Sequence, residues 1–436
     1  MAANFKVGDK VSVQTKDAKY EGIVMPSPEG FADVLAIKLA SGYNLGVKLT
    51  KDVSVKKIGG SSRESPKPTA IKAPVKKGLP NVVVVATGGT ITSKVDYTTG
   101  GVSPLSKPEE LLLATPELLD IVNIKRISNP FSVFSEDMGP KDWQLIAKEV
   151  AKALNESDVS GVIVTHGTDT LHYTAAALSF FLKNLNKPVA LVGGQRSSDR
   201  GSFDGGMNLI CAAHYCLSNI AEVAIVMHGN SADTHCIASR GTNTRKMHTT
   251  RRDTFRPINE LPLAKIWPNG KLEITNKNFK QRNNKGKVAV DDKFEEKVAL
   301  IKFFPGADPR ILHHFVDHKY KGVIIEATGL GHVATNPRNK DNSWLPVIKD
   351  AIKRGLFIGF APQPLYGRLD PYVYSTGREL LNAGVCYLGS MLSETAYVKL
   401  GHVLAKAKNM NDAKTMMLTN MSGEIVERIL PESFLY

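Results

Sequence analysis

Cysteine is scarce in this 436-residue chain: four occur, with no Cys-x-x-C pair and no repeated spacing. That pattern favours free, buried thiols in a reducing compartment over disulfides or a metal site. The eleven histidines likewise lack a second ligand pair at the spacing of zinc sites. We therefore expect no metal site in this chain.

Long apolar runs and targeting signals are also missing. No stretch approaches the ~18 apolar residues needed to span a bilayer. The first residues, Met1–Lys6, lack the apolar core and cleavage site of a secretory signal peptide. We expect a cytoplasmic protein that makes no contact with a membrane.

Two threonine-bearing turns stand out among the residues that are present. Thr87-Gly-Gly-Thr90 and His166-Gly-Thr-Asp169 each follow a run of β-branched residues. Such runs are typical of buried parallel strands, and ligands and catalytic groups collect at the carboxyl ends of those strands. We therefore expect both turns at one crevice. Either turn alone would also suit an ordinary strand-to-helix connection or a helix N-cap, and neither has the spacing of a phosphate-binding loop.

The two turns resemble the signature motifs of the bacterial-type L-asparaginase/glutaminase family. Three further segments occur in the order expected for that family. Phe134–Met138 resembles its substrate-binding loop, and Gly193–Arg196 with Asp204–Leu209 resembles the stretch after the third strand. Lys246, nine residues ahead of Phe255, falls where the family places its catalytic lysine. The resemblance covers roughly residues 81 to 436.

This resemblance implies displacement of ammonia from a side-chain amide through a threonyl acyl-enzyme, which water then hydrolyses. It makes Thr90 the nucleophile and places Thr168, Asp169 and Lys246 in a second catalytic cluster. A threonine hydroxyl needs such a neighbouring cluster, because it accepts an acyl group only when a base removes its proton. The backbone of the glycine turn, Gly89 included, would supply the oxyanion donors, since glycine permits close approach.

The resemblance also assigns the substrate contacts. Ser135 and Asp169 would hold the α-carboxylate and α-ammonium groups of the amino acid. Glu136 stands where the family more usually has Gln; its extra charge would favour the ammonium, and it leaves the preferred amide donor open. Tyr97 lies in a Gly- and Thr-rich segment, where it is either a lid residue that activates Thr90 or a surface aromatic.

Apolar runs alternate with helix-like segments, among them 142–155 and 170–185, through the main body of the chain. This alternation is typical of a three-layer, mostly parallel α/β sheet. We expect a larger asparaginase-like α/β domain at 81–290, which carries the catalytic motifs, and a smaller C-terminal α/β domain at 298–436.

The first 80 residues differ from this pattern. Residues 1–50 contain four or five short alternating segments with glycine turns, which predict a small SH3-like β-barrel. Residues 51–80 contain eight Lys/Arg, two acids and four prolines, which favour a flexible or extended linker. This linker and a second basic stretch, 271–287, suit either a solvated surface or contact with nucleic acid.

Free members of the family generally lack such a barrel and linker. The presence of the barrel and the linker, together with the segment Gln363–Arg378, is similar to a branch of the family that serves tRNA-dependent amidotransferases. The similarity implies a glutaminase that supplies ammonia for converting Glu-tRNA(Gln) to Gln-tRNA(Gln). The amidotransferase E subunit would be its partner and would bind ATP and magnesium, with no cofactor in this chain.

The same similarity implies a homodimer within a heterotetramer, and contact with tRNA through the complex. A free cytoplasmic L-asparaginase/glutaminase is the alternative enzyme. A non-catalytic binding module on an enzyme fold is a further alternative, against which the intact Thr90, Thr168 and Lys246 argue.

Overall fold

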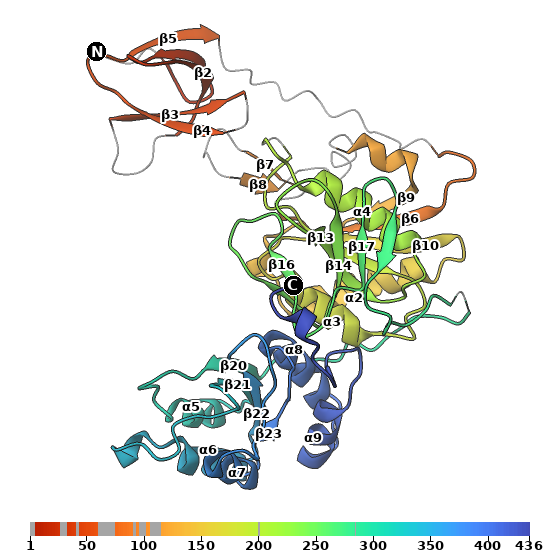
Figure 1. Ribbon diagram of the computed structural model, residues 1–436, viewed down its shortest axis with the longest axis vertical. Coiled ribbons are helices and arrows are strands. Elements are labelled where there is room, and N and C mark those ends of the chain that lie inside the picture. Colours follow the sequence, from red (N-terminus) through yellow and green to blue (C-terminus); the bar gives the residue numbers. More distant parts are fainter. Residues whose placement is uncertain are drawn as a thin grey trace.

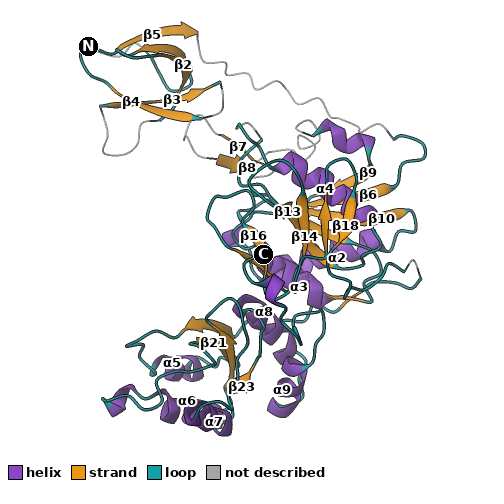
Figure 2. Cartoon of the chain, in the orientation of Figure 1, coloured by secondary structure: helices purple, strands orange, loops and turns teal. Residues whose placement is uncertain are grey.

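The computed structural model describes residues 5–26, 33–40, 43–59, 75–89, 93–95, 102–104, 115–198, 201–283 and 285–436. Three units follow one another along the chain: a small antiparallel sheet, a larger α/β domain and a smaller one (Figure 1). The described part of the first unit consists of strands and loops, and the helices lie in the other two (Figure 2). No helix in the described ranges combines the length and apolar character that a membrane crossing requires.

The N-terminal unit is a five-stranded antiparallel sheet with the order β4-β3-β2-β1-β5. Alternate residues such as Val11, Val13 and Ile37 are fully buried in its core, as the alternating sequence pattern predicts. Its strands are β1 (Lys10–Gln14), β2 (Lys19–Val24), β3 (Val34–Leu39), β4 (Asn44–Lys48) and β5 (Ser54–Gly59).

Strand β5 corrects the predicted boundary of this unit. It pairs antiparallel with β1 but lies within the segment 51–80 that we predicted to be a linker, so the β-rich unit extends to Gly59 instead of ending at residue 50. Only Val55 of this strand packs on the core, whereas Lys56 and Lys57 are exposed. An edge strand with so few apolar contacts has no clear alternation, and its charge suggested a linker.

The larger domain is built on an eight-stranded sheet with the order β18-β17-β14-β13-β12-β10-β6-β9. Five neighbouring strands of this sheet, β9, β6, β10, β12 and β13, run parallel. Strands β14, β17 and β18 continue the sheet with antiparallel pairing. Its strands are β6 (Asn81–Ala86), β9 (Asn123–Ser128), β10 (Val159–Thr165), β12 (Val189–Val192), β13 (Val223–His228), β14 (Cys236–Arg240), β17 (Ala264–Ile266) and β18 (Leu272–Ile274).

Side-chain alternation along these strands separates two cores. Val83 and Val85 of β6 pack with helices α2 (Pro140–Leu154) and α3 (Leu171–Phe181), whereas Val82 and Val84 pack with α4 (Gly205–Leu217) on the other face. Burial on both faces explains the continuous apolar runs. The smaller elements are β7 (Ser93–Val95), β8 (Val102–Pro104), η2 (Pro116–Asp120), η3 (Ser135–Asp137), β11 (Leu182–Lys183), β15 (Thr244–Lys246), β16 (Phe255–Pro257) and β19 (Ala289–Val290).

The smaller domain has a parallel four-stranded sheet with the order β20-β21-β22-β23. One face packs against α5, α6 and α7, and the other against α8 and α9, so the predicted two-domain, three-layer fold is confirmed. Its elements are β20 (Val298–Lys302), α5 (Ile311–Asp317), β21 (Gly322–Ala327), η4 (Lys340–Asn342), α6 (Trp344–Lys353), β22 (Phe357–Pro362), α7 (Ser375–Asn382), β23 (Cys386–Tyr387), α8 (Ser393–Leu404), α9 (Met410–Leu418) and η5 (Pro431–Ser433).

Helices α3 and α8 form the contact between the two α/β domains. Thr395 Oγ1 at the start of α8 donates a 2.7 Å hydrogen bond to the carbonyl of Thr242. Arg245 forms an ion pair with Glu394 of the same helix. Arg245 lies in β15 and Thr242 lies just ahead of that strand, so the domain interface helps to hold Lys246, the last residue of β15.

Candidate active site

The carboxyl ends of β6 and β10 bring the two threonine-bearing turns together. The strands pair in parallel with Ala86 opposite Thr165, so both end at the same level. Thr87 Oγ1 donates a 2.9 Å hydrogen bond to the carbonyl of Thr165, which joins the turns directly. The turns therefore adjoin at one edge of the sheet, as the strand pattern predicts.

Three glycines allow the loops at this edge to touch. A Cβ on Gly89, where φ is +85°, would lie 2.4 Å from the Cα of Gly167. A Cβ on Gly167 would lie 2.8 Å from the Cβ of Ser135, and one on Gly193 would lie 2.7 Å from Thr168 Cγ2. Side chains at these positions would force the loops apart, so glycine is what sets the spacing of the site.

Lys246 joins the second turn from the hairpin of β15 and β16. Its Nζ donates to Thr168 Oγ1 at 2.9 Å and to Asp169 Oδ1 at 2.7 Å. The Lys246 side chain is 11% exposed, Thr168 is buried, and Asp169 is 65% exposed. Because Thr168 Oγ1 accepts from the amine, its own O–H is free to donate to a reacting group. The structure thus gathers three of the four predicted catalytic residues.

His166 holds the second turn in place. Its Nδ1 lies 2.7 Å from the carbonyl of Gly167, and its Nε2 lies 2.8 Å from Thr174 Oγ1 on α3. Burial lowers its pKa to about 4. Burial likewise lowers the pKa of His172, at the start of α3, to about 3, and the nearby charges of Arg245 and Lys246 contribute to the shift. Both rings are therefore neutral near pH 7.

The predicted substrate loop lies against this cluster. Ser135 is buried in the short helix η3, and its carbonyl accepts a 2.6 Å hydrogen bond from Thr170 Oγ1. Glu136, the next residue, is exposed. The loop is thus anchored beside the turn that carries Thr168 and Asp169. Thr90 and Tyr97 lie outside the described residues, and the roles of all these residues stay predictions.

Family models match most of the chain. Residues 81–280 match the N-terminal asparaginase domain and residues 297–417 the glutaminase/asparaginase C-terminal domain, while residues 5–58 match the GatD N-terminal domain. The D subunit of the glutamyl-tRNA(Gln) amidotransferase from Pyrococcus abyssi is 50% identical over 97% of this chain and 95% of its own. The D subunit from Thermococcus kodakarensis is 49% identical over 98% and 96%.

The chain belongs to the family of glutamyl-tRNA(Gln) amidotransferase D subunits.

Solved structures confirm the asparaginase-like fold of this D-subunit family member. The thermostable L-asparaginase from Thermococcus kodakarensis superposes with a TM-score of 0.69 at 26% identity, over 80% of this chain and 100% of its own. The L-asparaginase I from Vibrio cholerae does so with a TM-score of 0.67 at 28% identity, over 80% and 99%. The superpositions thus leave a fifth of this chain uncovered, and that fraction is similar in size to residues 1–80.

Several residues that support the site were not predicted from the sequence. Arg245 reaches Glu394 across the domain interface, 149 residues away. Asn208 forms hydrogen bonds with His228 and with the carbonyl of Gly193, which packs on Thr168. His228 ends an apolar strand and belongs to no motif, so nothing in its sequence context marks it. Asn208 lies within Asp204–Leu209, a segment that resembles the family, but the resemblance gives it no role.

Proposed function

We propose that this chain is the glutaminase subunit of a glutamyl-tRNA(Gln) amidotransferase. It hydrolyses glutamine through a threonyl acyl-enzyme and supplies ammonia for the conversion of Glu-tRNA(Gln) to Gln-tRNA(Gln). The observation that carries the proposal is the cluster of Thr168, Asp169 and Lys246 at the end of β10, in a chain that matches D subunits over nearly its full length.

The reaction assigns the nucleophile to Thr90. Its oxygen attacks the side-chain amide carbon of glutamine, the C–N bond breaks, and the departing nitrogen takes up a proton and leaves as ammonia. Water then attacks the ester, glutamate leaves, and the Thr90 hydroxyl is restored. The N–H groups of the glycine turn stabilise the oxyanion formed in each step.

The second cluster supports both steps. Thr168 relays a proton through its hydroxyl, which Lys246 orients at 2.9 Å. Asp169 fixes the amine at 2.7 Å and extends into solvent, where it meets the substrate's α-ammonium group. Held in this position, the amine places positive charge next to the developing negative charge.

Ser135, Glu136 and Asp169 select a free amino acid. Ser135 contributes its hydroxyl to the α-carboxylate, whereas Glu136 and Asp169 contribute negative charge toward the α-ammonium group. The position of Ser135 against Gly167 supports this assignment, because it places the loop beside the catalytic turn. The family resemblance gives Tyr97, which lies outside the described residues, the role of a lid residue that activates Thr90.

The amidotransferase E subunit is the partner that uses the ammonia. It activates the γ-carboxyl group of Glu-tRNA(Gln) with ATP and magnesium, and this chain holds no cofactor of its own. Two copies of each of the two proteins form a heterotetramer, which contacts tRNA and works in the cytoplasm.

Glutamine hydrolysis should therefore respond to the partner. We expect the rate for the full-length chain to rise when the E subunit and Glu-tRNA(Gln) are added. Removing residues 1–74 should reduce that gain and leave glutamine binding intact. The cut must spare Lys76, whose N–H and carbonyl both bind the side chain of Asn123 in the larger domain. Raising the salt concentration should reduce the gain as well, because it screens exposed charges.

The superposition on L-asparaginases supports the alternative of a free asparaginase. That alternative predicts full activity in the isolated chain and no response to partner or tRNA. A full-length chain that hydrolyses asparagine faster than glutamine, and at the same rate with or without the E subunit, would establish it.

A further inference from the structure

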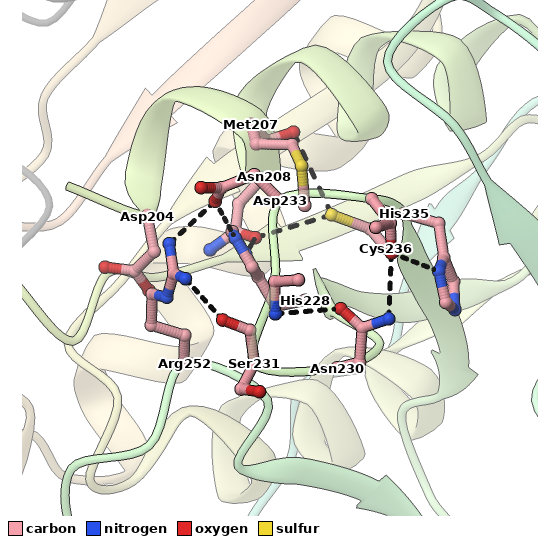
Figure 3. A network of polar contacts seen from close by, with 12 residues as sticks. Asp204, Met207, Asn208, His228, Asn230, Ser231, Asp233, His235, Cys236 and Arg252 are labelled. Carbon is pink, nitrogen blue, oxygen red and sulfur yellow. Dashed lines mark hydrogen bonds and ion pairs between the residues drawn. The ribbon is translucent and has the colours of Figure 1, made fainter. Parts of the chain in front are cut away.

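Figure 3 shows a connected set of polar side chains around His228 and Asn208, which the proposed chemistry does not use. Gly193 packs directly on Thr168, since a Cβ at this position would lie 2.7 Å from Thr168 Cγ2. The Gly193 carbonyl accepts a 3.0 Å hydrogen bond from Asn208 Nδ2. Asn208 Oδ1 in turn lies 2.6 Å from His228 Nδ1. Fully buried side chains thus connect His228 to the back of Thr168.

The amide of Asn208 determines which nitrogen of His228 carries a proton. Asn208 Nδ2 donates to the carbonyl of Gly193, so Oδ1 is the acceptor and His228 Nδ1 is the donor. Burial lowers the pKa of His228 below its ordinary value, and the hydrogen bond to Asp233 opposes that effect. Near neutral pH the ring is therefore neutral, with its single proton on Nδ1. The hydrogen bond to Asn208 is kept in this state.

The contact on the other side of the ring depends on a second proton. His228 Nε2 lies 3.0 Å from Asp233 Oδ1, and a carboxylate can only accept. The neutral ring has no proton on Nε2 to donate. Asp233 is also 64% exposed and takes a 2.6 Å hydrogen bond from Arg252. The buried contact with Asn208 is therefore the one through which His228 acts on the site.

The segment that follows His228 also holds the hairpin of Lys246. Arg252, in the loop between β15 and β16, binds Asp233, and Arg256 donates a 3.0 Å hydrogen bond to the carbonyl of Gly229. Thr168 and Lys246, which bind each other at 2.9 Å, are thus supported by one short segment of the chain, 228–233. A shift of His228 would move them relative to each other.

We propose that His228 is a positioning residue for the glutaminase reaction, which acts through Asn208 and Gly193 to keep Thr168 within hydrogen-bonding distance of Lys246. The inference rests on the proposed function and assigns a residue to it that no motif contains. A displacement of ~1 Å at a reacting group reduces the rate on the order of a hundredfold.

Two substitutions distinguish the roles of the two ring nitrogens of His228. In His228→Asn, the side-chain amide can take the place of Nδ1 and donate to Asn208. In His228→Gln, the longer amide reaches the place of Nε2 and leaves Asn208 Oδ1 without its donor. His402→Gln is the matched control, because His402 is equally buried but binds the carbonyl of Lys293 at the domain interface. Each full-length variant is assayed with the E subunit for kcat and KM on glutamine.

We expect His228→Gln to lower kcat about tenfold or more, with KM changed less than about threefold, since remote misplacement acts on the chemical step. His228→Asn should stay within about threefold of the unsubstituted chain, and His402→Gln should change the melting temperature without lowering kcat. Equal losses in the Asn and Gln variants, or full activity in His228→Gln, would overturn the assignment.

Hydrogen exchange tests the same idea without relying on catalysis. Amides in 165–170 and 192–196 should exchange faster in His228→Gln and at the original rate in His228→Asn. Unchanged exchange in His228→Gln would refute the positioning role even if the chain proves to hydrolyse no glutamine. Absence of glutamine hydrolysis in the unsubstituted complex would instead refute the proposed function, and the exchange result would still decide the role of His228.

Discussion

Replacing Lys399 with Met should destabilise the chain strongly, because the substitution leaves a buried carboxylate without its partner. Lys399 on α8 and Glu424 in the C-terminal segment are both completely buried, and their side chains form an ion pair. Lys399 Nζ also donates to the carbonyls of Met417 and Thr419 at 2.8 and 2.6 Å. Glu424 accepts from backbone N–H groups, including Ser422 N at 2.7 Å.

The expected cost of Lys399→Met is about 3–5 kcal/mol in the free energy of unfolding, which is typical of removing one partner of a buried pair. Adding Glu424→Gln should recover part of that loss, since a neutral amide still accepts from Ser422 N but carries no buried charge. Arg310→Met is the control: it removes an exposed ion pair with Asp308 and should cause no measurable change.

Guanidinium unfolding followed by circular dichroism measures these differences. The reasoning fails if Lys399→Met costs less than about 1 kcal/mol, the range typical of an exposed pair. It also fails if the double variant is no more stable than Lys399→Met alone.

Three further predictions concern the site. Gly89→Ala should lower both the melting temperature and the glutaminase activity, because its Cβ would lie 2.4 Å from Gly167 Cα. Gly78→Ala is the control: φ is +92° there and nothing lies near the added Cβ, so backbone strain alone should lower its melting temperature, by less than in Gly89→Ala. The free energy of unfolding, measured by urea denaturation, should decrease as the pH is lowered from about 6.5 to 4. The unfolded histidines take up protons at their ordinary pKa, whereas the pKa values of folded His166 and His172 are about 4 and 3. His172→Leu should show a shallower decrease, and an equal decrease would exclude His172 as a cause. N-acetylglutamine should release ammonia far more slowly than glutamine, because the acetyl group removes the positive charge that Glu136 and Asp169 are proposed to bind. Equal rates would exclude both residues from the substrate site.

The elements that the sequence predicted well are those with strong local patterns. The run Asn81–Ala86 is buried on both faces, so its continuous apolar character marks it as a central parallel strand. The helix predicted at 142–155 is α2, whose buried residues recur at helical spacing. Because β6 and β10 are neighbours, the pattern also placed the two threonine-bearing turns together.

The elements that the sequence did not predict depend on tertiary contacts. Strand β5 has little apolar surface of its own and is a strand because β1 offers it a free edge. The stretch 271–287 was noted for its charge, yet it contains β18, which pairs with β17 at the edge of the sheet. The contacts of Lys246 with Thr168 and of Arg245 with Glu394 join segments 78 and 149 residues apart. Local pattern does not encode such pairs.

A double-substitution cycle on Thr168 and Lys246 tests the central claim most directly, namely that the two residues act as one catalytic unit in glutamine hydrolysis. Thr168→Ala and Lys246→Ala should each lower kcat/KM on the order of a hundredfold or more without unfolding the chain. The double variant should be little worse than either single one, because each substitution already removes the 2.9 Å contact. Losses that multiply in the double variant, or single variants that keep most of the activity, would contradict the account.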